Sequence, residues 1–202
     1  MPPSRHRERV PEEGEAPDLK VGGLKGLQDP ELAPEERSLL LAFAEHHRIP
    51  SGELRIASLT DGRGRRQAMV LVASLGVLRQ LAAATGKLTG TDPPLFERDA
   101  MGLPAAATVR VRRTDLPRGI ARTAFWHERF PLVEQGEPAG RWATEPDTML
   151  AEVAEALALR LAFPSALEGV YTEGDLSDAL KDRELGRVRA ESEHRRQIEA
   201  LR

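Results

Sequence analysis

Residues 107–126 decide the fold, and they read ATVRVRRTDLPRGIARTAFW. Apolar Val109 and Val111 alternate with Arg110 and Arg112, which is the period of two expected of a β-strand with one apolar face. A turn segment with Pro and Gly follows, and then a second run of strand-forming residues. The pattern predicts an antiparallel hairpin with strands at 107–113 and 120–126.

An earlier segment follows the same pattern. Residues 54–59 and 65–72 favour strands, and the Gly-rich segment 60–64 between them is typical of a hairpin tip. Ser74 then suits the N-cap of a helix that runs to Thr85. A short strand is expected at 87–89, after that helix.

The longest helix is expected from a Thr144 cap to Phe163. Pro146 and Asp147 suit its first turn. Its buried stripe is expected to consist of Leu150, Val153, Leu157 and Leu161, with Glu152 and Glu155 on the exposed side.

Shorter signals flank this core. Residues 33–48 suit a helix that opens with Pro34 and acidic residues. Thr172 and Asp175 have the spacing of a capping box for a final helix. We therefore expect an α+β fold, in which a small antiparallel sheet built from two hairpins packs against helices, including one long helix in the C-terminal half.

Composition divides the chain into three parts. Residues 1–30 are rich in Pro, Glu and Gly and are expected to be a disordered tail. Residues 31–180 form the expected core, and residues 181–202 a charged C-terminal helix or tail.

Several classes of protein are disfavoured by composition. The absence of cysteine excludes a disulfide scaffold, a thiolate metal site and a cysteine nucleophile. Aromatic residues are only 4% of the chain, which argues against a repeated base-stacking platform. No apolar run approaches the roughly 18 residues of a membrane span, and the first ten residues lack the apolar stretch of a signal peptide. We expect a soluble protein of the cytoplasm.

No enzymatic motif stands out. The Gly62–Gly64 tip lacks both the spacing and the following helix of a phosphate-binding nucleotide loop. Neither Ser58 nor Ser74 lies in a recognisable nucleophile motif. Catalysis is therefore not expected.

The charge distribution points to an anionic partner. Residues 53–142 carry 14 basic and 9 acidic side chains, a net charge of +5, whereas both flanks are acidic. A basic centre suits phosphate binding, or the packing of one chain on another. The candidate phosphate-binding residues are Arg63, Arg65, Arg66, Lys87, Arg110, Arg112, Arg113, Arg118, Arg122, Arg141 and Arg160. The alternative is that arginines on an exposed strand are merely solvated or protect a sheet edge.

Arg160 leaves two interpretations open. It flanks the expected apolar stripe, and no carboxylate lies three or four residues away in the sequence. A partly buried guanidinium needs a partner, either a bound phosphate or a distant acid, such as Glu168 or one on a neighbouring subunit.

Residues 142–172 carry a family resemblance. They read WATEPDTMLAEVAEALALRLAFPSALEGVYT, which resembles the Trp–Pro–Met-Leu–Ala-Glu–Ala-Leu-Arg–Ala-Phe-Pro–Gly-Tyr-Thr pattern of the RecT/Redβ (Bet) family of phage single-strand annealing proteins. Residues 78–90, 109–112 and 125–128 are similar to upstream parts of that family, so the resemblance covers about residues 33 to 180.

The resemblance implies a non-catalytic recombination protein that binds single-stranded DNA, forms rings or filaments and anneals complementary strands without ATP. It implies no cofactor, although a divalent ion that accompanies the DNA stays open. Longer members add a module that engages an exonuclease or a single-strand-binding protein, and we expect that module to be absent here.

The chain departs from the family on the long helix. Lysines are common there in the family, at positions where this chain has Asp147, Glu152 or Val153. The alternative function is therefore an oligomeric scaffold of the same fold that has lost DNA binding.

Overall fold

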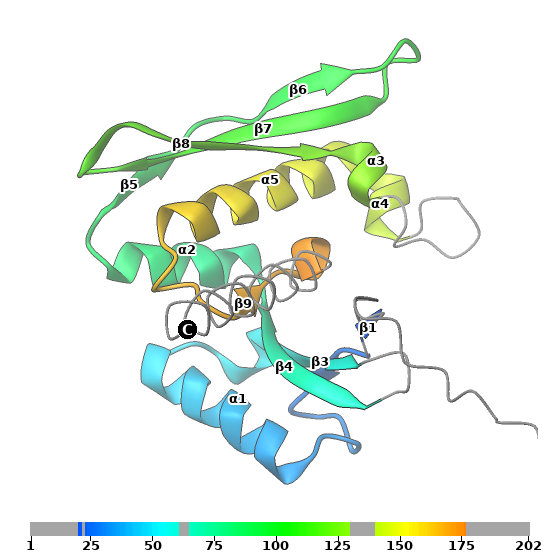
Figure 1. Cartoon of the computed structure of the whole chain (residues 1–202), viewed down its shortest axis with the longest axis vertical. Coiled ribbons are helices and arrows are strands. Elements are labelled where there is room, and N and C mark those ends of the chain that lie inside the picture. Colours follow the sequence, from blue (N-terminus) through cyan, green and yellow to red (C-terminus); the bar gives the residue numbers. More distant parts are fainter. Residues whose placement is uncertain (1–19, 22, 61–64, 130–139, 177–202) are drawn as a thin grey trace, which may run out of the picture.

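A computed structural model describes residues 20–21, 23–60, 65–129 and 140–176. The expected α+β fold is confirmed, with antiparallel hairpins, helices and one longer helix in the C-terminal half. The two hairpins lie in two different sheets rather than in one (Figure 1). The long helix lies directly beneath the second sheet, and the first sheet lies at the opposite end of the molecule beside the N-terminal helix (Figure 1).

The first sheet contains the earlier hairpin. Its strands are β1 (Lys20–Val21), β2 (Lys25–Gly26), β3 (Leu54–Thr60), β4 (Arg66–Ala73) and β9 (Val170–Tyr171). β3 and β4 are antiparallel, whereas β9 joins β4 in parallel. β1 and β2 both pair with β3, so chain before residue 31, expected to be disordered, contributes strands to this sheet.

The second sheet contains the later hairpin. Its strands are β5 (Leu88–Thr91), β6 (Leu95–Arg98), β7 (Pro104–Arg113) and β8 (Leu116–Phe125). β5 and β6 pair in succession with one side of β7, and β8 pairs with the other side. β8 starts earlier than expected because Gly119, at φ +64°, lies where the register between the strands shifts and absorbs the irregularity.

The helices are positioned by their caps. They are α1 (Pro34–His47), α2 (Leu75–Ala84), α3 (Trp126–Arg129), α4 (Arg141–Thr144) and α5 (Pro146–Ala162). Ser74 caps α2 as expected, since its Oγ accepts a hydrogen bond from the Val77 N–H.

The expected Thr144 cap of α5 is wrong. Thr144 ends α4, its hydroxyl donates to the Gly140 carbonyl, and Glu145 is the N-cap.

The expected capping box at Thr172 is confirmed, but among the described residues it opens only the 3₁₀ turn η4 (Glu173–Asp175). A second 3₁₀ turn, η1 (Ser51–Glu53), leads into β3. Beyond residue 176, the expected final helix lies outside the described residues.

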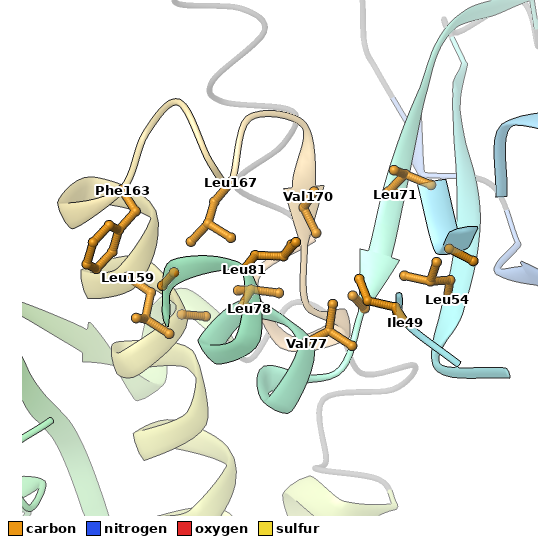
Figure 2. Packing of buried hydrophobic residues seen from close by; sticks show 14 of the residues in the cluster. Ile49, Leu54, Leu71, Val77, Leu78, Leu81, Leu159, Phe163, Leu167 and Val170 are labelled. Carbon is orange, nitrogen blue, oxygen red and sulfur yellow. The ribbon is translucent and has the colours of Figure 1, made fainter. Parts of the chain in front are cut away.

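The core joins α5 and α2 to the first sheet. Figure 2 shows side chains of α2 between those of α5 and those of β3 and β4. α5 also packs against β7 and β8, so it is buried on more than one side. The predicted stripe is therefore wrong at Leu161, which is 48% exposed, while Leu159 is fully buried.

Candidate nucleic-acid interface

The β7–β8 hairpin presents arginines to solvent as its alternation predicts. Val109 and Val111 are buried on the side that faces α5, and Arg110 and Arg112 are exposed on the opposite side. No described helix covers that outer side of the sheet (Figure 1). The alternation therefore does what the sequence predicts, placing a row of guanidinium groups on an open face.

The register separates Arg122 from that row. Arg122 lies opposite Val109 in the β7–β8 pairing, and residues directly opposite each other share a face of the sheet. Arg122 thus belongs to the side that faces α5, although it is exposed because β8 is an edge strand. Arg118 is also exposed, next to the irregularity at Gly119.

Carboxylates hold the basic residues near the β7–β8 turn. Arg112 lies 2.6 Å from Asp92, and Asp115 lies 2.7 Å from Arg113 and 3.0 Å from Lys87. The Arg113 guanidinium, and then Lys87, hold the pKa of the Asp115 carboxyl far below its usual range. These pairs account for three of the predicted phosphate-binding residues.

Arg113 also has a structural contact that the sequence did not indicate. Its guanidinium donates to the carbonyl of Ala162 at the end of α5 and lies over the ring of Phe163. This contact ties the turn end of the second sheet to the C-terminal end of α5.

The earlier hairpin is tied to α1. Arg66 lies 2.7 Å from Glu36 and 3.2 Å from Glu35. Glu36 is buried, and it also accepts from the Ala33 N–H and the Ser58 hydroxyl. Arg66 therefore neutralises a buried carboxylate. Arg65, which directly precedes β4, is exposed. Arg63 lies outside the described residues.

Arg141, on α4, and Arg160, on α5, also have carboxylate partners. Arg141 lies 2.9 Å from Glu152 and 3.4 Å from Glu145. Arg160 lies 2.7 Å from Asp175, which is fully buried, and its guanidinium covers the Tyr171 ring at 4.1 Å. The distant acid that sequence reasoning left open is thus present, although it is Asp175 and not Glu168.

Burial raises the pKa of Asp175, an effect that the Arg160 guanidinium and the two hydrogen bonds from Thr172 oppose. Because this carboxylate is buried and paired within the chain, its role is structural. A phosphate contact by Arg160 stays a prediction.

Three candidates remain without a carboxylate partner among the described residues: Arg110, Arg118 and Arg122. All three lie on β7 and β8 and are exposed. A phosphate can bind an exposed guanidinium group that has no internal ion pair without the free-energy cost of breaking such a pair.

A cavity of about 1170 Å³ between the two sheets is less suited to phosphate. Its charged lining consists of Glu53, Arg55, Arg79, Asp92, Arg141, Asp147, Glu152, Glu155 and Glu173. Each arginine there is already paired, Arg55 with Glu173, Arg79 with Glu155, and Arg141 with Glu152. A phosphodiester in this cavity would have to displace carboxylates.

The Arg79–Glu155 pair is the feature of this cavity that sequence reasoning missed. Two hydrogen bonds of 2.6 and 2.7 Å join the two side chains, and Glu155, expected to be exposed, is only 7% exposed. The Glu155 carboxylate raises the pKa of Arg79. The residues are 76 positions apart, so no local spacing could have indicated the pair.

Comparison with known proteins finds a family model that matches the second half of the core. Residues 96–185, which contain β7, β8 and α5, match the RecT family. This part of the chain is similar to the RecT family. No curated protein matches the chain.

RecT-family proteins are annealing proteins of phage-type recombination and are generally not catalysts, and their partner is DNA. Arg110, Arg118 and Arg122 all lie within the RecT-matched segment.

No helix in the described part of the chain is long and apolar enough to cross a membrane. Across the same residues, no three His, Cys, Asp or Glu side chains converge as a metal site would require.

Proposed function

We propose that this chain, which is similar to the RecT family over residues 96–185, binds single-stranded DNA by its phosphates and anneals complementary strands without ATP, as a self-assembling protein in the cytoplasm. The RecT match carries the proposal. The exposed, carboxylate-free Arg110, Arg118 and Arg122 of β7 and β8 support it. Base pairing supplies the free energy of annealing, so the protein's task is to hold a strand extended with its bases accessible.

The contact is electrostatic and nearly independent of sequence. Arginines that neutralise phosphates release counterions, so affinity falls with salt by a log–log slope of about 0.7 per phosphate contacted on a single strand. Few aromatic side chains are available for base stacking, which favours contact with the backbone.

The second candidate function, an oligomeric scaffold that has lost DNA binding, draws support from the same geometry. Arg66, Arg112, Arg113, Arg141 and Arg160, all predicted to hold phosphate, face carboxylates. The two functions differ in whether the exposed arginines of β7 and β8 suffice for binding.

Annealing of complementary oligonucleotides with ATP omitted tests the proposal. We expect the protein to accelerate annealing, and Arg110→Ala with Arg122→Ala to weaken single-strand binding and flatten the salt slope by up to about 1.4. The matched control removes two exposed arginines elsewhere, Arg37→Ala with Arg55→Ala, and should keep most of the affinity.

Addition of a divalent ion or a chelator, in separate runs, tests whether an ion accompanies the DNA. Salt-insensitive binding, or annealing no faster than the spontaneous rate at low salt, would favour the scaffold.

A further inference from the structure

Several hydrogen bonds hold the turn between β6 and β7. The Asp99 carboxylate accepts from the Met101 and Leu103 N–H groups at 2.8 and 2.9 Å. Backbone bonds also join Asp99 to Leu103 and to Gly102, and Arg98 donates to the Gly102 carbonyl at 2.9 Å. These hydrogen bonds hold the turn in one conformation.

This hydrogen-bonded turn displays apolar side chains to solvent. Met101 is 81% exposed and Leu103 is 54% exposed. Exposed apolar groups that lie together mark interaction surfaces. A turn that is already ordered also loses little conformational freedom on binding, which favours a contact there over one on a flexible loop.

The opposite end of the second sheet also exposes apolar side chains. Leu116 opens β8 and pairs with Arg113, and Arg113 in turn donates to Ala162, the neighbour of Leu161. Leu116 and Leu161 are both exposed, and the Arg113 contacts place them at the same end of the layer. β7 spans ten residues between the two ends, a distance of about 33 Å.

The two ends carry opposite charges. Glu97, Asp99 and Asp147 outweigh Arg98 at the β6–β7 turn. Lys87, Arg113 and Arg118 outweigh Asp115 at the β7–β8 end. The two ends therefore carry opposite net charges, and both also expose apolar side chains. This combination suits contact between two copies of the chain.

We propose that the β6–β7 turn of one copy docks on the β7–β8 end of a second copy, so that chains join head to tail along the second sheet. The proposal deepens the self-assembly in the proposed function and rests on it. Because each copy contributes a different surface, the contact is heterologous, and its repetition produces a ring or a filament.

Complementation of two monomeric variants tests the contact on the full chain without DNA. Met101→Asp with Leu103→Asp disables the turn, and Leu116→Asp with Leu161→Asp disables the opposite end. In sedimentation velocity, we expect the wild type to assemble and each variant to stay monomeric. The two variants mixed should form dimers and nothing larger, because only one intact contact remains.

Leu39→Asp with Leu41→Asp, at exposed apolar positions of α1, is the matched control and should assemble as the wild type does. Variants that are folded by circular dichroism yet assemble like the wild type would overturn the proposal. A mixture that stays monomeric, or a wild type that is monomeric at all concentrations, would also overturn it.

Charge reversal provides a test that spares the apolar residues. Glu97→Arg and Arg118→Glu should each raise the protein concentration needed for assembly by about tenfold, and their combination in one chain should restore assembly. Single variants that assemble normally, or a double variant that assembles no better than the single variants, would exclude the charge complementarity. DNA affinity, measured separately on the monomeric variants, reports on the proposed function alone.

Discussion

Arg160 connects two parts of the fold through an ion pair and a contact with an aromatic ring. Its guanidinium is the ionic partner of Asp175, which has no exposed surface, and it also covers the ring of Tyr171. Arg160 lies on α5, Tyr171 on β9 and Asp175 on η4. The pair thus connects the helix of the second layer to the strand that completes the first sheet.

Arg160→Ala should lower the free energy of unfolding by about 3–5 kcal/mol, because it leaves a buried carboxylate without its counter-charge. Urea unfolding measures the loss. Arg160→Met with Asp175→Asn should recover part of it, since Asn removes the buried charge and keeps an acceptor for Thr172. An unchanged midpoint with a lower DNA affinity would instead assign Arg160 to phosphate binding.

At the scale of the element, the β7–β8 hairpin depends on a single glycine. Gly119 has φ +64°, and a Cβ there would lie 2.6 Å from the Val111 carbonyl oxygen. Only glycine accommodates both the left-handed conformation and that close approach. The positions of the hairpin's exposed arginines, Arg118 and Arg122, depend on this irregularity.

Gly119→Ala should therefore destabilise the protein by about 1–3 kcal/mol and weaken single-strand binding. Gly102→Ala is the matched control, because Gly102 also has a positive φ, of +81°, but has open space around its Cβ position. Thermal unfolding of both variants should show the larger loss for Gly119. Equal losses would mean that the backbone conformation alone, without the Val111 contact, determines the cost.

At the scale of the whole molecule, the first sheet includes chain that composition assigns to a tail. β1 and β2 pair with β3, and Val21, Leu24 and Leu27 pack against buried clusters. Each strand is only two residues long, so neither would be detected from a periodicity.

Deletion of residues 1–30 should reduce the free energy of unfolding by about 3 kcal/mol, the value expected from losing a few partly buried apolar side chains. Deletion of residues 1–18 keeps β1 and β2 and should leave the melting temperature unchanged. Calorimetry of both truncated proteins measures their melting temperatures for this comparison. Equal melting temperatures would mean that β1 and β2 contribute nothing to stability.

The local elements of this protein were predictable because their signals are local. The alternation of Val109 to Arg112, the Ser74 cap and the capping box of Thr172 and Asp175 each depend on residues within a few positions of one another. The family resemblance was also visible in the sequence, and residues 96–185 match the RecT family.

The ion pairs of the charged side chains depend on contacts between residues far apart in the sequence. Arg66 meets Glu36 across 30 residues and Arg79 meets Glu155 across 76, and neither distance has a sequence signal. The burial of Glu155 likewise follows from where α5 packs. Which faces of a strand carry charge can be derived from the sequence, because side-chain direction alternates along the backbone of a strand. Whether those charges remain available for a phosphate depends on which carboxylates the fold brings within 4 Å of them.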